Sequence, residues 1–144
     1  MKDNLPKIIK YKRNTVPNRE SLIKLYDDAG WVAYTSQPEK LLAGFKNSLA
    51  VYTAFEGNEL VGLIRIIGDG NTIIYIQDIL VLTKFRNQGI GKNLMKMAVD
   101  DFSHVRQMVL LTDDNSNTNG FYTSCGFTPA DTTGCRAYLK LKGE

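Results

Sequence analysis

The sequence contains few residues of the kinds that build disulfide frameworks, metal centres and membrane spans. There are two cysteines and one histidine among 144 residues. The two cysteines form neither a disulfide framework nor a metal-ligand pattern, so we expect Cys125 and Cys135 to be free thiols. No apolar run reaches the roughly 18 residues that a spanning helix needs, and residues 1–14 lack the apolar stretch of a signal peptide. We therefore expect a cytoplasmic protein without a metal and without a membrane partner.

A strong charge of one sign is also missing. The formal net charge is +3, and the 18 lysines and arginines are scattered along the chain, whereas nucleic-acid binding needs basic side chains gathered on one face. Nucleic acid is therefore not an expected partner. With 43% hydrophobic and 23% charged residues, the chain has the composition of a globular protein. Its length suits a single domain, residues 1–144, with one core.

Hydrophobic periodicity predicts the order of the elements in the first half of the chain. Apolar residues at helical spacing predict two helices, at residues 17–30 and 38–47, after a short strand at 7–13. Three strands rich in β-branched and aromatic residues follow, and the Gly and Asn residues between them favour an antiparallel meander. These strands are expected at residues 49–56, 59–68 and 71–83.

The second half of the chain predicts a parallel strand pair. An amphipathic helix that begins at Gly91 follows the third strand of the meander and leads into an apolar strand at 107–112. Strand, helix and strand in this order indicate a βαβ crossover, which is right-handed in nearly all proteins. A short helix at 120–125 and an alternating strand at 135–142 are expected to close the chain. The fold class is therefore α/β, with helices packed on a mixed sheet.

The stretch KFRNQGIGKNLM, residues 84–95, combines a glycine-rich loop with the start of a helix. Such loops commonly bind phosphates, because glycine lets the backbone approach closely and the first helical turn presents unpaired N–H groups. A Walker A loop would need glycine at position 86 and serine or threonine at 93, and a dinucleotide loop would need a third glycine at 94. The residues found there are Arg86, Asn93 and Leu94, which exclude both motifs.

Two motifs that lie far apart in the chain together resemble the GNAT superfamily of N-acetyltransferases. The first is R-x-x-G-x-G at residues 86–91, between an apolar strand and an amphipathic helix. The second is Asn115, followed seven positions later by Tyr122 and then by a Gly-Phe pair at 126–127. The resemblance extends from about residue 50 to the end of the chain. It implies a central mixed β-sheet of about six to seven strands flanked by about four helices, with one βαβ crossover.

The resemblance implies that acetyl-CoA is the acetyl donor and that amides of the loop bind its pyrophosphate. The Arg86 and Lys92 side chains would be further phosphate partners, although Lys92 equally suits a solvated first helical turn. The pantetheine arm would pair with the strand before the loop, by backbone groups that need no particular side chain. The implied cofactor-binding residues are Ile79, Leu80, Val81, Arg86, Asn87, Gln88, Gly89, Ile90, Gly91, Lys92, Asn115, Phe121 and Tyr122.

The resemblance also implies that Tyr122 donates a proton or a hydrogen bond to the departing coenzyme A sulfur. Because the reference pKa of tyrosine, about 10, exceeds that of a thiol, about 8.5, hydrogen bonding to the thiolate is easier than full proton transfer. The base that deprotonates the amine is not obvious at Tyr75 or Gln77, where relatives place it. Asp78 is the only carboxylate on this strand, but alternation puts it on the opposite face unless a bulge re-aims it. A relayed water is an equal alternative.

The implied function is acetyl transfer from acetyl-CoA to a primary amine, by direct attack in a ternary complex. The acceptor would be a small molecule or a protein amine. Acidic and aromatic residues that would suit a cationic amine lie where the family's variable helices flank the acceptor site, namely Asp27, Asp28, Trp31 and Tyr34. Because no obvious base is present, the alternative is a non-catalytic acyl-CoA-binding module that regulates a partner. The sequence leaves the acceptor and the oligomeric state, including a homodimer, open.

Overall fold

The computed structural model describes residues 8–143, which fall into two compact units, residues 8–111 and residues 112–143. Each unit has its own internal contacts and is described by itself. Lys7, the first residue of the strand predicted at 7–13, lies outside the described residues, as do the other residues before it.

The first unit is built on a five-stranded sheet whose strands lie side by side in the order in which they occur in the chain. The first four strands are antiparallel neighbours, and the fourth and fifth are parallel. This confirms the predicted meander and the predicted parallel pair across a helix. The strands are β1 (Ile9–Lys12), β2 (Ala50–Glu56), β3 (Glu59–Gly68), β4 (Ile73–Val81) and β5 (Gln107–Leu110).

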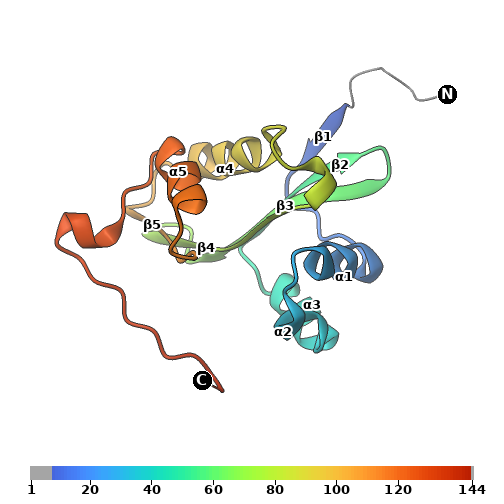
Figure 1. Ribbon diagram of the computed structural model, residues 1–144, viewed down its shortest axis with the longest axis horizontal. Helices are drawn as coiled ribbons and strands as arrows, with labels where there is room; N and C mark the ends of the chain where they lie inside the picture. The colour runs from blue at the N-terminus through green and yellow to red at the C-terminus, as the bar shows by residue number, and fades with distance from the viewer. Residues whose placement is uncertain (1–7, 144) are drawn as a thin grey trace. The chain divides into compact units, whose positions relative to one another are not determined.

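Four helices of the first unit cover the two faces of this sheet, and Figure 1 shows α4 on one side and the three earlier helices on the other. The Asn18 side chain caps the first helix by accepting the Ser21 N–H at 2.9 Å, and Pro38 occupies the first turn of the third. The four-residue helix α2 was not predicted, because one turn is too short to show a period. The helices are α1 (Arg19–Asp28), α2 (Val32–Thr35), α3 (Pro38–Lys46) and α4 (Ile90–Asp101).

The central strand β3 is buried on both faces, and its two faces meet different helices. A Cβ atom at Gly62 would lie 3.2 Å from Ile90 Cγ2 of α4. Arg65, three positions later, points to the other face, where its guanidinium carbon lies 5.1 Å from the centre of the Phe45 ring of α3. The fully buried side chains on both faces include Leu22, Leu25, Leu63, Ile64, Ile66, Ile74, Leu94 and Met95. The core therefore holds the functional strands rigidly between two helical layers.

The second unit contains α5 (Ser116–Ser124) and a 3-10 helix, η2 (Ala130–Thr133). The helix predicted at 120–125 is thus present and begins four residues earlier. The prediction of a closing strand at 135–142 was wrong, because these residues form no strand and Tyr138 and Leu139 are exposed. Alternation favours an extended chain, but a strand also needs a neighbour for its backbone hydrogen bonds. Among the described residues the sheet therefore has five strands rather than six to seven, and there are five α-helices rather than four.

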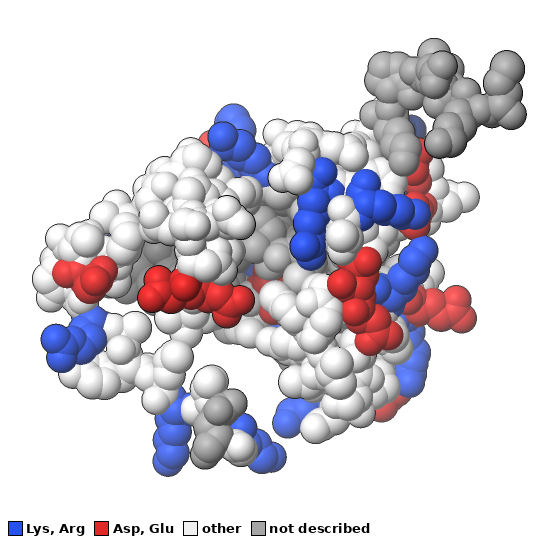
Figure 2. All heavy atoms as spheres, in the orientation of Figure 1, with Lys and Arg blue, Asp and Glu red and all other residues white. Residues whose placement is uncertain are grey.

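Charged side chains of both signs are intermixed on the face shown in Figure 2. Several form exposed ion pairs, such as Arg13 with Asp101 at 2.7 Å and both Lys24 and Lys84 with Glu59. Within residues 8–143 one ion pair is buried, that of Arg65 with Asp78, and it belongs to the site described below. None of the helices formed by residues 8–143 is long and apolar enough to cross a membrane.

Candidate functional site

The glycine-rich loop connects the short 3-10 helix η1 (Thr83–Phe85) to α4. Its backbone enters the left-handed region at Asn87, with φ of 63°, and at Gly89, with φ of 82°. Gly89 is the N-cap of α4 and supplies no side-chain cap. The first backbone bond of the helix runs from the Asn93 N–H to the Gly89 carbonyl at 3.0 Å. Three N–H groups precede this bond and have no intrahelical acceptor, those of Ile90, Gly91 and Lys92.

Buried side chains anchor both ends of this loop. Phe85 before it is fully buried, and Ile90 after it is 2% exposed. The residues between them are exposed, and so is Lys92 in the first turn of the helix. Arg86 and Lys92 form no ion pair with any acidic residue in the described part of the chain. The loop thus combines unpaired N–H groups, the positive end of a helix and two uncompensated cations, which together suit an anion.

The strand that leads into the loop has one open edge. Its ladder with β5 ends at Ile76, which pairs with Leu110. On the opposite edge, the Leu82 N–H donates to the Val61 carbonyl at 2.8 Å. Because backbone groups alternate in direction along a strand, those of Leu80 also face β3, whereas those of Ile79 and Val81 face the edge that β5 no longer covers.

Arg86 uses this open edge. Its Nε donates to the Val81 carbonyl at 3.3 Å, a long bond on an exposed side chain. The Leu80 side chain is instead buried, with 5% exposure. Of the three strand residues predicted to bind the cofactor, Ile79 and Val81 therefore direct backbone groups to the open edge, where the Val81 carbonyl accepts only the long bond from Arg86. Leu80 contributes to the core.

A β-bulge in β4 changes the direction of the side chains after it. Arg65 pairs with Asp78 and the next residue of β3 pairs with Ile76, so Gln77 is the extra residue. The Gln77 amide donates to the Tyr34 hydroxyl at 3.1 Å, and Asp78 accepts from the Tyr26 hydroxyl at 2.7 Å. Both side chains therefore reach the face covered by α1 and α2. Strand alternation alone predicted opposite faces for Gln77 and Asp78, and the bulge is the exception that the sequence analysis allowed.

Asp78 is the centre of a buried polar network. Its side chain is 1% exposed and its Oδ2 accepts hydrogen bonds from Arg65 Nε at 2.9 Å and from the Tyr26 hydroxyl. Burial, and then the negative charge of Asp78, raises the pKa of Tyr26, so this phenol remains a donor. The second carboxylate oxygen, Oδ1, is buried and has no hydrogen-bond partner. An unpaired buried acceptor is costly, so this oxygen is suited to a donor that arrives with a ligand.

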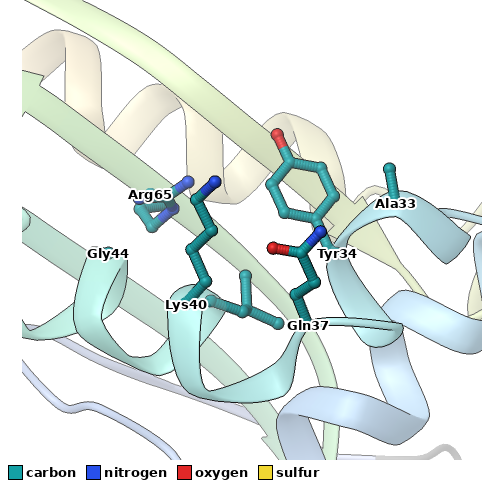
Figure 3. Close-up of a pocket in the computed structure, with 7 residues that line it drawn as sticks. Ala33, Tyr34, Gln37, Lys40, Gly44 and Arg65 are labelled. Carbon is teal, nitrogen blue, oxygen red and sulfur yellow. The ribbon is translucent and has the colours of Figure 1, made fainter. Parts of the chain in front are cut away.

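Two pockets lie beside this network. The acidic pocket, as we call the one that includes Asp78, has a volume of about 430 Å³ and is lined by Gly30, Trp31, Val32, Ala33, Tyr34, Gln77 and Asp78. The basic pocket has a volume of about 240 Å³ and is lined by Ala33, Tyr34, Gln37, Lys40, Leu41, Gly44 and Arg65. Figure 3 shows the side chains of the basic pocket converging from α2, α3 and β3.

Aromatic rings form one wall of the acidic pocket. The Trp31 and Tyr34 rings lie 5.8 Å apart, and each packs edge-on against the buried Tyr26. Of the acidic residues predicted to flank an acceptor, Asp28 instead accepts the backbone N–H and the hydroxyl of Thr83, at 2.8 and 2.9 Å. It therefore ties the end of α1 to the start of the loop region.

The second unit contains Tyr122, Phe121 and Asn115. The Asn115 side chain caps α5 by accepting the Thr118 N–H at 2.9 Å. The Tyr122 ring packs edge-on against Phe121 and Phe127, with centroid distances of 5.0 and 6.3 Å. Burial raises the pKa of Tyr122 above its ordinary value of 10.0. Both thiols of the chain, Cys125 and Cys135, are free.

The structure thus brings the predicted strand and loop residues together in the first unit, with Asp78 on the same strand. Sequence reasoning missed Arg65, Tyr26 and Lys40. A signal for Arg65 was available, because a lone arginine inside the apolar run LVGLIRIIG must find a partner when the strand is buried. Tyr26 and Lys40 carry no such signal, since each looks like an ordinary residue of an amphipathic helix.

Comparisons with known proteins identify the class of this fold and site. The family model described as the acetyltransferase (GNAT) family matches residues 17–127, well over half of the chain. The chain therefore belongs to the GNAT family of acetyltransferases, and the resemblance stated above is confirmed. This places the chain among acyltransferases.

Individual relatives agree with this assignment. A GNAT family acetyltransferase of Streptococcus pneumoniae TIGR4 is 34% identical, with a TM-score of 0.84 over 95% of this chain and 100% of that one. A protein of unknown function from meticillin-resistant Staphylococcus aureus, provisionally described as an acetyltransferase, is 26% identical, with a TM-score of 0.77 over 93% and 100% of the two chains. A Gibberella zeae protein, provisionally named an acetyltransferase, is 34% identical over 65 residues. That match spans 43% of this chain and 37% of the relative's length.

Proposed function

We propose that this protein is an acetyl-CoA-dependent N-acetyltransferase that transfers an acetyl group to a primary amine by direct attack in a ternary complex. One observation carries the proposal above all others. The N–H groups of Ile90, Gly91 and Lys92 are free at the start of α4, and the strand that leads into the preceding loop has an edge that is open at Ile79 and Val81. A ligand with a diphosphate at one end and an amide chain at the other matches both features.

The loop would hold the diphosphate of the donor. Burying such a charge unpaired costs several kcal/mol, whereas each hydrogen bond to a charged group contributes about 1.5 to 3 kcal/mol. Three unpaired N–H groups of α4 therefore cover the cost, and the Arg86 and Lys92 side chains add charge. The pantetheine amides would pair with Ile79 and Val81 as an added strand does, with Arg86 releasing the Val81 carbonyl.

The acidic pocket would hold the amine. An amine with a pKa near 10.4 is neutral in only about one molecule in 10³ at pH 7, so a proton must leave before attack. Two routes fit the residues that line the pocket. The unpartnered Oδ1 of Asp78 accepts the proton directly, or a water held by Gln77 and Tyr34 relays it to solvent.

Tyr122 would stabilise the leaving thiolate by donating a hydrogen bond. Because burial raises the pKa of Tyr122 beyond that of an ordinary phenol, transfer of its proton to a thiolate is even less favourable than for free tyrosine. Hydrogen bonding to the developing negative charge needs no such transfer. Asn115 would support this position through the start of α5, and Phe121 through its ring contact with Tyr122.

The test is thiol release from acetyl-CoA across a panel of primary amines, with acetyl-CoA binding measured separately by calorimetry. We expect binding without an amine and release of free thiol with at least one amine class. Absence of acetyl-CoA binding would refute the proposal at its first step.

A non-catalytic acyl-CoA-binding module that regulates a partner is the second candidate. The observation that favours it is the engagement of Asp78 Oδ2 by both Arg65 and Tyr26, which ties the sole carboxylate of the acidic pocket into the fold. This candidate predicts tight acetyl-CoA binding with no turnover on any amine of the panel. The same two measurements therefore separate the candidates.

A further inference from the structure

The acidic and basic pockets adjoin, because Ala33 and Tyr34 line both of them. They differ in charge. Among the described residues, Asp78 is the only carboxylate that lines the acidic pocket, and no lysine or arginine lines it. Lys40 and Arg65 line the basic pocket, and no acidic residue of the described part of the chain does. A molecule that occupies both pockets would therefore meet the Asp78 carboxylate at one end, and at the other end Lys40 and the Arg65 guanidinium that is paired with Asp78.

Arg65 keeps hydrogen-bonding capacity on the side of the basic pocket. Its Nε is bonded to Asp78, and its Nη1 lies 3.5 Å from Ser48 Oγ, at the limit of a hydrogen bond. A guanidinium has five N–H donors in a fixed fork, so most of them have no strong partner. The side chain is 9% exposed, and its guanidinium carbon lies 5.1 Å from the centre of the Phe45 ring. It is therefore a fixed group rather than a mobile surface arginine.

Lys40 supplies the second cation. It lies on α3 and is exposed, and it forms no ion pair with any acidic residue among residues 8–143. Figure 3 shows its amine directed into the pocket on the same side as the Arg65 guanidinium. Its sequence neighbour Glu39 is paired with Arg19 and lies outside the pocket lining. The charge of Lys40 is thus not cancelled within the described chain.

Gly44 leaves room for this arrangement. A Cβ atom at Gly44 would lie 3.2 Å from Arg65 Nη1, closer than ordinary van der Waals contact. Glycine in the middle of a helix costs about 0.5 to 1 kcal/mol relative to alanine. Its presence at this position keeps the guanidinium accessible from the pocket.

We propose that the acceptor is zwitterionic: an amine carrier whose second group, a carboxylate or a phosphate, binds Lys40 and Arg65 in the basic pocket while its amine lies in the acidic pocket. This inference rests on the proposed acetyltransferase function. An anion is favoured at the basic pocket because the charge of Lys40 is opposed by no described acid of the lining. The Nη groups of Arg65, whose Nε is paired with Asp78, can add strong and directional charge-assisted bonds to an oxyanion. A polyamine would instead place a second cation against Lys40 and Arg65, which costs energy.

The experiment compares steady-state kinetics on matched acceptors, with α-amino acids and aminoalkyl phosphonates against the carboxamides of the same amino acids. Each acceptor is tested with the wild type, with Lys40→Gln and with Lys46→Gln. Lys46 is a matched control because it is an exposed lysine of the same helix that does not line the pocket. Comparing variants on one acceptor removes the difference in amine pKa between an acid and its amide.

We expect the wild type to prefer the anionic acceptors. Lys40→Gln should raise their KM about tenfold relative to the KM of the amides, with a smaller change in kcat, as the loss of one charge-assisted contact predicts. Lys40→Arg should restore most of the preference, and Lys46→Gln should keep it. Gly44→Ala should also weaken it, by crowding Arg65.

Two results would overturn the inference while leaving the proposed function intact. One is turnover of amides or polyamines as fast as, or faster than, turnover of the acids. The other is a preference for acids that Lys40→Gln and Lys46→Gln change equally. Failure of the proposed function looks different, since no acceptor would then release thiol from acetyl-CoA.

Discussion

Arg65 and Asp78 form a buried ion pair across β3 and β4, with Nε and Oδ2 2.9 Å apart and side chains that are 9% and 1% exposed. Tyr26 from α1 adds a hydrogen bond to the same carboxylate oxygen. The two partners line different pockets, Asp78 the acidic one and Arg65 the basic one, and Tyr26 links the pair to α1. The pair therefore connects the stability of the fold with the position of the only carboxylate in the acidic pocket.

Replacing Asp78 by asparagine should destabilise the protein strongly. Removing one partner of a buried ion pair leaves the other charge buried without compensation, which typically costs about 3 to 5 kcal/mol. We expect a decrease of that order in the free energy of unfolding, measured by urea denaturation.

The matched control for this variant is Asp100→Asn. Asp100 forms an exposed pair with Lys96 one helical turn away, and such pairs contribute about 0.5 kcal/mol or less. An equal loss of stability in the two variants would show that the buried pair adds nothing beyond a surface pair.

Replacing Gly89 by alanine should weaken acetyl-CoA binding as well as folding. Gly89 has φ of 82°, and a residue with a Cβ atom pays about 1 to 2 kcal/mol there. Relief of that strain would turn the loop N–H groups away from the diphosphate, so calorimetry should show about a tenfold higher Kd, the equivalent of one lost contact.

Gly57→Ala serves as the control for backbone strain. Gly57 has φ of 59° in the turn between β2 and β3, and a Cβ atom there would meet nothing within 4 Å. This variant should lose comparable stability and keep its affinity for acetyl-CoA. A similar loss of affinity in both variants would argue against a binding role of the loop.

The sequence predicts the sheet of the first unit well, because a strand that is buried on both faces appears in the sequence as a continuous apolar run. The β3 strand was predicted with the bounds that the structure gives it, since the turn residues on either side of the apolar run mark where the strand begins and ends. The final strand failed for the opposite reason. Alternation at 135–142 describes a chain that could pair, and pairing depends on a neighbour that local sequence does not specify.

The candidate site was only partly predictable for a related reason. Glycines and a helix start mark the loop, because special backbone angles and unpaired N–H groups require particular residues. Asp78 could not be oriented from alternation, since the extra residue at Gln77 reverses the direction of the side chains beyond it. Tyr26, which donates to Asp78, lies on α1, whereas Lys40 and Arg65, which line the basic pocket, lie on α3 and β3. Only the tertiary fold brings these three residues together.

The turn between β3 and β4 should make stability depend on acidic pH through Asp69. Hydrogen bonds from the Thr72 hydroxyl and from the N–H groups of Thr72, Asn71 and Ile73 lower the pKa of Asp69. A carboxylate whose pKa is lower in the folded state stabilises the fold above its unfolded pKa of about 3.9, and this contribution is lost as pH falls toward the folded pKa.

Asp69→Asn tests this dependence. Asparagine keeps one oxygen acceptor for the turn but has no charge to titrate. We expect the urea midpoint of the wild type to decrease from pH 5 to pH 3 more steeply than that of the variant. Parallel pH profiles would show that Asp69 does not carry this part of the acid sensitivity.

Replacing Tyr122 by phenylalanine should lower kcat by about 100-fold, the usual effect of removing one donor to a developing negative charge, while acetyl-CoA still binds. Tyr138→Phe is the matched control, because that phenol is 85% exposed and lies in the same unit. The pH profile of kcat adds an independent readout of the same role.

Burial raises the pKa of Tyr122 above 10.0, so Tyr122 remains a hydrogen-bond donor over the working pH range. The rate should therefore rise as the amine loses its proton, without a descending limb below about pH 10. A descending limb below that pH, present in the wild type and absent from Tyr122→Phe, would instead mean that Tyr122 ionises within the working range. A kcat that is unchanged in Tyr122→Phe would remove Tyr122 from the mechanism.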